Sequence, residues 1–204
     1  MKRFISLSLV FLFTALCLFG CTNDKDTGDT TASPNTAEHS KVLFTMENGD
    51  TFTVELYPEY APATVANFLK LTNEGFYDGL TFHRVVDNFM AQGGDPEGNG
   101  MGGSDETIPG EFSSNGFASN TLSHTRGVIS MARSNDPNSA SSQFFICYTD
   151  DCAFLDGNYA AFGEVIEGME TVDAFLKVER TYGSDGAVSS PLTPIVIESA
   201  KVIG

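Results

Sequence analysis

The sequence contains no tryptophan, and its 204 residues include only four cysteines, three histidines and eleven lysines and arginines. The 27 aspartates and glutamates outweigh the basic residues and give a formal net charge of −16. Binding to a nucleic-acid backbone depends on clustered lysine and arginine, so the composition argues against a nucleic-acid partner. Scattered histidines without paired-cysteine spacing argue against a metal site, and no cofactor is expected.

The length and composition favour one soluble domain. A chain of 204 residues has room for a domain of roughly 150 to 170 residues plus appendages. Its 20 glycines and 17 phenylalanines are typical of a protein built from strands and turns around an aromatic core.

The N-terminus has the pattern of an export signal. Residues 1–20 begin with Lys2 and Arg3 and continue as an apolar run, which predicts a signal peptide. An uncleaved membrane anchor is disfavoured because the run is short for a bilayer of ~30 Å. The motif LFGC, which ends at Cys21, resembles the lipobox of bacterial lipoproteins, and this resemblance implies cleavage before Cys21 and its acylation. Simple secretion stays open because Phe19 is bulkier than the residues usual there.

Residues 21–40 are predicted to be a flexible, lipid-anchored linker. Apart from one lysine they are small, polar or acidic, and they offer too little apolar surface to offset the entropy lost on ordering. The folded domain is then expected over residues 41–204. A lipid on Cys21 would make the membrane a partner and would place the protein outside the cytoplasm, tethered to a bacterial membrane.

The two remaining cysteines of the predicted domain are Cys147 and Cys152. An oxidising compartment permits a disulfide between them. Cys147 falls in a predicted strand, however, and a bridge to a residue five positions on needs a sharp reversal to bring the Cα atoms within about 7 Å. Free thiols are therefore favoured, and a disulfide is the alternative.

Hydrophobic periodicity predicts the elements of the domain. Alternating apolar residues at 42–46 and 52–56 flank Asn48-Gly49, which predicts a hairpin. Helical spacing follows from Pro62, with Gly75 suited to the C-terminal end. A second short helix and the remaining strands are predicted near residues 169–176, 82–86, 89–93, 127–132, 142–148, 160–165 and 195–202. Eight strands and two helices without a βαβ repeat indicate a closed antiparallel barrel.

One stretch, residues 82–95 (FHRVVDNFMAQGGD), concentrates unusual side chains on neighbouring strands. If residues 87–88 form a tight turn, Met90 and Gln92 share a face, and Arg84 lies beside them on the partner strand. The result is an apolar wall carrying one cation and one amide. The glycine-rich loop that follows has no Lys-Ser/Thr and no helix behind it, so it does not predict a phosphate site.

Three more motifs follow in order: GVISMAR at 127–133, SSQFFI at 141–146 and AFLDGNYAAFGEV at 153–165. Together with residues 82–95 they resemble the cyclophilin family of peptidyl-prolyl isomerases, and the similarity extends over residues 41–204. The resemblance implies a mainly β fold, a closed eight-stranded antiparallel barrel capped by two α-helices, with the active groove on its outer wall. It also implies an enzyme that accelerates X-Pro isomerisation in exported proteins and assists their folding.

The resemblance assigns roles to individual side chains. Arg84 would be the catalytic donor to the prolyl nitrogen, with Gln92 orienting it; the alternative for Arg84 is a surface salt bridge. His83 alternates away from Arg84 and is predicted to be structural. The substrate-binding residues would be Phe89, Met90, Phe145 and Leu155 around the proline ring, Gln143 and the backbone of Ala132 and Arg133 along the peptide, and Phe154 and Tyr159 in the groove wall.

Three positions depart from the family pattern. Phe154 stands where many members have tryptophan, Arg133 replaces asparagine and Tyr159 replaces histidine. Loss of the indole N–H would weaken binding of cyclosporin, for which the family is known. Arg133 adds a positive rim that would favour acidic peptides.

The expected partners are proline-containing unfolded or extended polypeptides, and the chain itself is expected to be a monomer. A different class of function is a non-catalytic module or chaperone that holds proline peptides on the same fold. The presence of both Arg84 and Gln92 favours the enzyme. A solute-binding lipoprotein would need two lobes and a longer chain.

Overall fold

The computed structural model of the protein describes residues 39–204. The predicted signal peptide, Cys21 and the predicted linker as far as residue 38 lie outside the described residues. The last linker residues, His39 and Ser40, contact the domain: the Leu56 amide donates to the Ser40 carbonyl at 2.9 Å, and a His39 ring nitrogen lies 3.1 Å from the Glu59 carboxylate.

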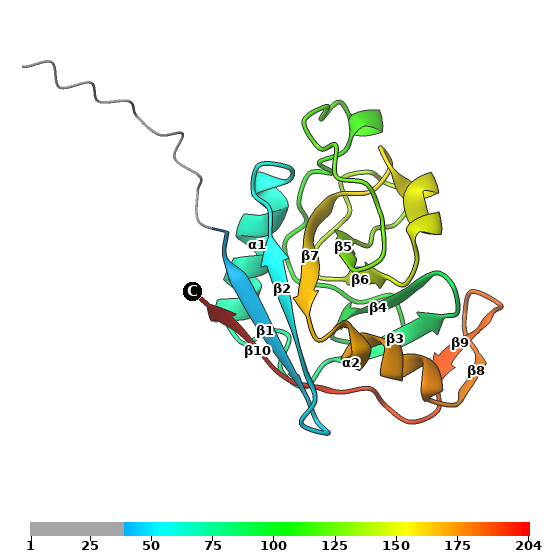
Figure 1. The fold of residues 1–204 in the computed structure, drawn as a ribbon. Coiled ribbons are helices and arrows are strands. Elements are labelled where there is room, and N and C mark those ends of the chain that lie inside the picture. The colour runs from blue at the N-terminus through cyan, green and yellow to red at the C-terminus, as the bar shows by residue number, and fades with distance from the viewer. Residues whose placement is uncertain (1–38) are drawn as a thin grey trace, which may run out of the picture. The chain divides into compact units, whose positions relative to one another are not determined.

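The described residues form ten strands and two α-helices (Figure 1). Three short 3₁₀ helices connect them, at Ser113–Asn115, Asp150–Leu155 and Phe175–Lys177. In chain order the strands and α-helices are β1 (Lys41–Met46), β2 (Thr51–Leu56), α1 (Pro62–Asn73), β3 (Thr81–Val86), β4 (Met90–Asp95), β5 (Val128–Met131), β6 (Phe144–Cys147), β7 (Ala161–Glu167), α2 (Met169–Ala174), β8 (Arg180–Tyr182), β9 (Val188–Pro191) and β10 (Ile197–Ile203).

The first hairpin forms as the sequence predicts. Strands β1 and β2 pair antiparallel with Phe44 opposite Phe52, and both rings are buried and stacked with centroids 4.7 Å apart. Gly49 has a φ of +86°, which a residue with a Cβ rarely adopts. Alternation along both strands therefore directs one row of apolar side chains into the core.

The main sheet is eight-stranded and antiparallel, in the order β10-β1-β2-β7-β5-β6-β4-β3. The predicted closed barrel is corrected to a curled, open sheet, because within residues 39–204 no ladder joins the edge strands β3 and β10. They approach each other at one end, through an isolated bridge between Thr81 and Val196. Backbone hydrogen bonds flank it, from the Phe82 amide to the Ile195 carbonyl at 2.9 Å and from the Ile197 amide to the Leu80 carbonyl at 2.8 Å. Alternation fixes which side chains face inward, but it does not fix how far the sheet curls.

Helix α1 lies beside β1 and β10 and obtains its N-terminal cap from a distant residue (Figure 1). Ala61 provides no side-chain cap. The buried Glu111 carboxylate instead accepts the amides of Ala63 and Thr64 at 2.9 and 2.8 Å. These bonds satisfy amides that a helix leaves without partners, and they place a negative charge at its positive end.

The core is aromatic and continuous across the sheet and α1. Its largest fully buried members include Phe44, Phe68, Phe82, Phe144 and Phe162. The Phe144 ring packs against those of Phe44, Phe68, Tyr77 and Phe82 at centroid distances of 5.6 to 5.8 Å. Seven of the 13 phenylalanines among residues 39–204 are buried in this one cluster inside the curl of the sheet.

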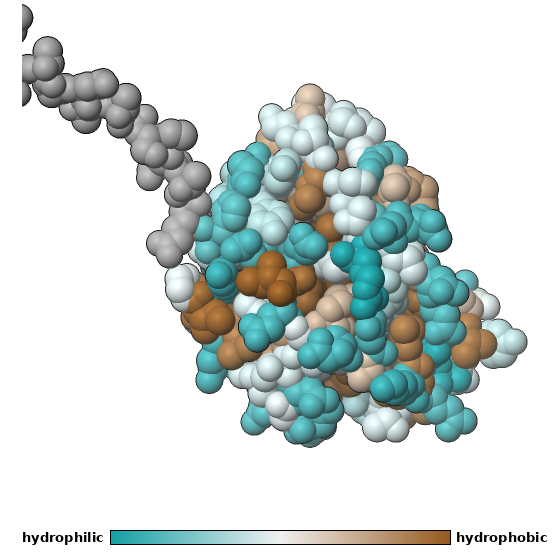
Figure 2. All heavy atoms as spheres, viewed as in Figure 1, coloured by the Kyte–Doolittle hydropathy of each residue, from teal (hydrophilic) through white to brown (hydrophobic). Residues whose placement is uncertain are grey.

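A second sheet, which consists of the two strands β8 and β9, was not predicted from the sequence. It forms a hairpin that lies beside β3 (Figure 1). Among residues 39–204, none of the helices has the length and apolar character needed to cross a bilayer. On the face drawn in Figure 2, hydrophilic side chains cover most of the surface, and hydrophobic ones form small separate patches.

Candidate active site

The site is built on the hairpin of β3 and β4. Its turn contains Asn88, whose φ of 58° is the one left-handed value among the non-glycine residues described. Asparagine tolerates this conformation better than most residues, so the predicted tight turn is confirmed. Strand pairing then places Arg84 directly opposite Gln92 and Val86 opposite Met90.

The Arg84 guanidinium lies over the apolar wall, as predicted, although the loop between the paired strands has three residues, 87–89, and not two. Its Nη1 donates to Gln92 Oε1 at 3.2 Å and lies 4.0 Å from Met90 Sδ, and its Cζ is 5.9 Å from the centroid of the Phe89 ring. Gln92 in turn donates through Nε2 to Gln143 Oε1 at 2.8 Å. The two amides form a relay that fixes the orientation of Gln92.

A carboxylate also contacts this guanidinium. Arg84 Nε donates to Asp185 Oδ2 at 2.7 Å, and the two side chains are 32% and 22% exposed. The salt bridge considered as an alternative for Arg84 is therefore present, but it occupies one edge of the guanidinium only. Within residues 39–204, Nη2 donates no hydrogen bond.

A cavity of about 140 Å³ adjoins the guanidinium. Its floor is formed by the apolar side chains of Met90, Phe145 and Leu155, which are almost fully buried, at 1%, 5% and 7% exposed. The lining residues are Arg84, Phe89, Met90, Gln92, Ala132, Arg133, Phe145, Leu155 and Tyr159. We call this cavity the socket.

Two predicted site residues lie outside the socket. Gln143 lines a neighbouring cavity of about 230 Å³ together with Gln92, and donates to the Gly102 carbonyl at 2.7 Å. Phe154 is 68% exposed at the rim, where its ring lies 5.6 Å from that of Phe89. The structure thus brings the eleven predicted residues into one continuous region, with Phe154 outermost.

The glycine-rich loop after β4 forms a wall of the second cavity, a role that sequence reasoning missed. Gly100, Met101 and Gly102 all line it. The buried Asp95 carboxylate holds the loop by accepting the amides of Glu97, Asn99 and Gly100 at 2.8, 3.0 and 2.5 Å. Burial alone would raise the pKa of Asp95, but these three bonds lower it below its usual value.

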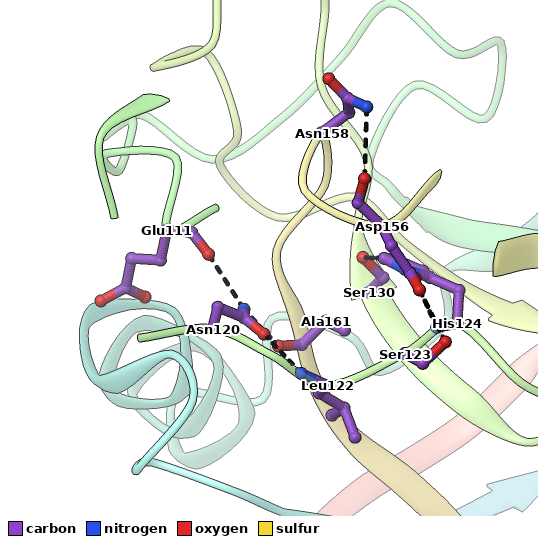
Figure 3. A network of polar contacts seen from close by, with 9 residues as sticks. All are labelled: Glu111, Asn120, Leu122, Ser123, His124, Ser130, Asp156, Asn158 and Ala161. Carbon is purple, nitrogen blue, oxygen red and sulfur yellow. Dashed lines mark hydrogen bonds and ion pairs between the residues drawn. The ribbon is translucent and has the colours of Figure 1, made fainter. Parts of the chain in front are cut away.

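A buried polar network lies behind the socket (Figure 3). His124 is fully buried, with Nδ1 2.8 Å from Asp156 Oδ1 and Nε2 2.9 Å from Ser130 Oγ. Its ring stacks on that of Phe145, with centroids 6.0 Å apart. Although these three residues have the composition of a hydrolytic triad, Ser130 is 0% exposed, so its hydroxyl cannot reach a substrate.

The burial of His124 in this network predicts that the folded protein becomes less stable at acidic pH. Burial lowers the pKa of His124, and this effect outweighs the opposing hydrogen bond and charge of Asp156. The folded protein therefore keeps His124 neutral while the unfolded chain takes up a proton below pH ~6.5, so stability falls as the pH drops below that value. Burial lowers the pKa of His83 as well, and it acts in the same direction.

Urea denaturation between pH 7.5 and 5.5 checks this expectation. The wild-type protein is expected to lose unfolding free energy as the pH falls, and His124→Asn is expected to show a shallower slope because one proton-linked group has been removed. An unchanged slope in His124→Asn would contradict the assignment.

Arg133 also lines the socket, and hydrogen bonds to backbone carbonyls hold its guanidinium in place. Its Nε and Nη2 donate to the Asn158 carbonyl at 3.1 and 2.9 Å, and its Nη1 donates to the Ser134 carbonyl at 2.8 Å. The guanidinium carbon lies 4.6 Å from the Tyr159 ring centroid. Among the described residues it pairs with no carboxylate, so a positive charge remains at the rim.

Cys147 and Cys152 lie beneath the socket as buried free thiols. Cys152 Sγ is 3.3 Å from the Phe89 carbonyl. Burial raises the pKa of the Cys147 thiol, and the neighbouring Cys152 adds to this shift, so the group stays protonated. Within residues 39–204 no group of three or more histidines, cysteines or carboxylates is arranged to hold a metal ion.

The fold and site define a β protein that carries an apolar socket, two hydrogen-bonded amides and one fixed guanidinium on its sheet. A family model, cyclophilin type peptidyl-prolyl cis-trans isomerase/CLD, matches residues 41–202. The chain belongs to this family, and it is a cyclophilin-type peptidyl-prolyl cis-trans isomerase.

Individual relatives agree. A probable peptidyl-prolyl cis-trans isomerase of Brucella suis is 42% identical over 173 residues, which cover 79% of this chain and 82% of the relative. Peptidyl-prolyl cis-trans isomerase B of Bacillus subtilis is 47% identical over 127 residues, covering 62% and 84%. The structure of a Cryptosporidium parvum cyclophilin has a TM-score of 0.71 and 29% identity, covering 81% of this chain and 98% of that one.

Proposed function

We propose that this isomerase acts outside the cytoplasm on proline-containing exported polypeptides, held to a membrane by a lipid on Cys21, with Arg84 as its catalytic donor and Gln92 as the residue that orients it. The observation that carries the site assignment is the position of the Arg84 guanidinium. It is held at Nε and Nη1 beside an apolar socket, while Nη2 has no partner within residues 39–204.

The chemistry requires no nucleophile. An X-Pro amide interconverts over a barrier of ~18–20 kcal/mol, because amide resonance is lost in the twisted state. As resonance is lost, the prolyl nitrogen becomes pyramidal and gains a lone pair that accepts a hydrogen bond. A fixed donor at that nitrogen stabilises the twisted amide more than either planar form, and each ~1.4 kcal/mol of that difference is a tenfold gain in rate.

The surroundings of Arg84 suit this task. The apolar floor of Met90, Phe145 and Leu155 would anchor the proline ring while the preceding acyl group turns. The planar Arg84 guanidinium is held rigidly, at Nε by Asp185 and at Nη1 by Gln92. Gln143 and the backbone of Ala132 and Arg133 would hold the peptide main chain across the second cavity.

Arg133 would bias substrate choice. Its charge is compensated by carbonyl dipoles and aromatic rings but by no carboxylate among the described residues. A peptide with an acidic side chain near its proline would gain an ion pair there, so acidic peptides are the proposed preference.

A proline peptide as substrate is supported by a related structure. A 30% identical Cryptosporidium parvum cyclophilin, with a TM-score of 0.70, was determined in the presence of the dipeptide Ala-Pro.

The competing proposal is a module that binds proline peptides without turning them over. A coupled assay of cis-to-trans conversion in an Ala-Pro peptide separates the two. Turnover by the wild-type protein supports the enzyme, whereas saturable peptide binding without turnover would establish the module.

The lipid anchor has its own test. Residues 1–21 carry the basic start, the apolar run and the LFGC motif. Expressed in a bacterium that processes lipoproteins, the protein is expected in the membrane fraction with a diacylglyceryl-modified Cys21 at its N-terminus by mass spectrometry, and as a monomer after detergent extraction. Cys21→Ser is expected to abolish the modification. A soluble protein with an unmodified N-terminus at Thr22 or later would refute the anchor.

A further inference from the structure

Arg84 has a partner from a distant part of the chain. Asp185 lies 101 residues further on, in the turn between β8 and β9, and accepts from Arg84 Nε at 2.7 Å. Its other oxygen, Oδ1, accepts the Ala187 amide at 3.0 Å and the Ser189 hydroxyl at 2.8 Å. The carboxylate is therefore fixed by its own hairpin on one side and directs Oδ2 to the guanidinium on the other.

The hairpin itself is fastened to the strands of the site. Arg180 donates through Nη1 to the Val85 carbonyl at 3.2 Å and through Nη2 to Asp87 Oδ1 at 2.9 Å. At the end of the hairpin away from the turn, the Leu192 amide donates to the Glu179 carbonyl at 2.8 Å. The position of Asp185 relative to β3 is thus set by contacts to Val85 and Asp87, which follow Arg84 in the chain.

The turn is also shaped around the carboxylate. A Cβ on Gly183 would lie 2.5 Å from Ser189 Oγ and 3.0 Å from Asp185 Oδ1, so a larger residue there would displace both partners. Burial alone would raise the pKa of Asp185, but hydrogen bonds from Arg84, Ala187 and Ser189 hold it below its usual value. The carboxylate is consequently charged at neutral pH.

We propose that Asp185 is a positioning residue for catalysis: it holds Arg84 by Nε and thereby fixes the direction of the guanidinium at the socket. Gln92 holds Nη1 from the β4 side. A planar group held at two nitrogens cannot swing about its side chain, so its third nitrogen, Nη2, points in one direction. Asp185 does not line the socket and acts only through Arg84. The inference rests on the proposed catalytic role of Arg84.

The test compares Asp185→Ala and Asp185→Asn with a matched control. Asp173 forms a similar exposed pair with Arg126, 2.7 Å apart and remote from the socket, so Asp173→Ala removes an equivalent carboxylate. With an Ala-Pro peptide, Asp185→Ala is expected to lower kcat about tenfold and to change KM by less than about twofold, because the apolar socket is intact. Asp173→Ala is expected to match wild type.

Two further readouts separate positioning from a structural role. Asp185→Asn has one acceptor oxygen for the groups that Oδ1 and Oδ2 now bind, so it is expected to recover only part of kcat. A variant that recovers none although its Tm matches wild type would overturn the proposal. The Tm of both variants is expected to fall by no more than about 4 °C, because the lost bonds to Arg84, Ala187 and Ser189 lie at the β8–β9 hairpin and outside the ladders of the main sheet.

The double variant Arg84→Ala/Asp185→Ala distinguishes this inference from the proposal beneath it. If Asp185 acts through Arg84, the double variant is as slow as Arg84→Ala alone. Full activity in Arg84→Ala would refute the catalytic role itself. An impaired Arg84→Ala variant alongside an Asp185→Ala variant as fast as wild type, or faster, would leave that role intact and overturn the role of Asp185.

Discussion

Replacing Arg84 with alanine is expected to lower kcat/KM for an Ala-Pro peptide by about 10²–10³-fold, the loss typical of removing one preorganised donor from a transition state. The lost group is one that the proposed mechanism uses only when the prolyl nitrogen is pyramidal, so the loss falls on kcat rather than KM. Stopped-flow or protease-coupled kinetics at several peptide concentrations measure both constants.

Arg126→Ala is the matched control for this prediction. Arg126 is also a partly exposed arginine on a surface carboxylate, Asp173, but it does not line the socket. It is expected to retain wild-type kcat/KM. Equal activity in both variants would show that the guanidinium of Arg84 is a surface group without a catalytic role, and the socket would then be a binding site alone.

Replacing Phe144 with alanine is expected to reduce the free energy of unfolding by about 3–5 kcal/mol. Phe144 is fully buried and packs against four other rings in the core, so its removal leaves a cavity that β6 cannot fill. Its neighbour Phe145 points to the opposite face and forms the socket floor. Urea denaturation followed by circular dichroism measures the loss.

The matched control is Phe154→Ala, which removes the same ring from the rim. Phe154 is 68% exposed, so its loss is expected to change the unfolding free energy by no more than about 0.5 kcal/mol. A loss in Phe144→Ala no larger than in Phe154→Ala would contradict the description of the core. The contrast also separates a residue that stabilises the fold from one that is proposed to contact substrate.

The parts of the fold that local pattern determines were predictable. Alternation and a turn-forming pair gave the β1–β2 hairpin, and a helical period after Pro62 gave α1. The sequence predicted a turn after Val86 and the grouping of Arg84, Gln92 and Met90, but not the register that produces it. A two-residue loop at 87–88 would pair Arg84 with Ala91, whereas the three-residue loop 87–89 pairs Arg84 with Gln92 and puts both on one face.

Other features depend on contacts between distant segments. The β8–β9 hairpin is short and polar, with no apolar alternation to reveal it, although the dipeptide Asp185-Gly186 is a turn signal. Glu111 reaches α1 across nearly fifty residues, and His124 meets Asp156 only once the sheet has formed. Sheet closure likewise depends on how the edge strands β3 and β10 approach each other, which no local pattern encodes.

The most direct measurement of the central claim is the rate at which an Ala-Pro peptide interconverts while bound, obtained by NMR exchange spectroscopy on wild type and Arg84→Ala at saturating protein. The account predicts that the variant binds the peptide within a few-fold of wild-type affinity but interconverts it at least tenfold more slowly. A variant that loses affinity while bound peptide still interconverts at the wild-type rate would contradict it.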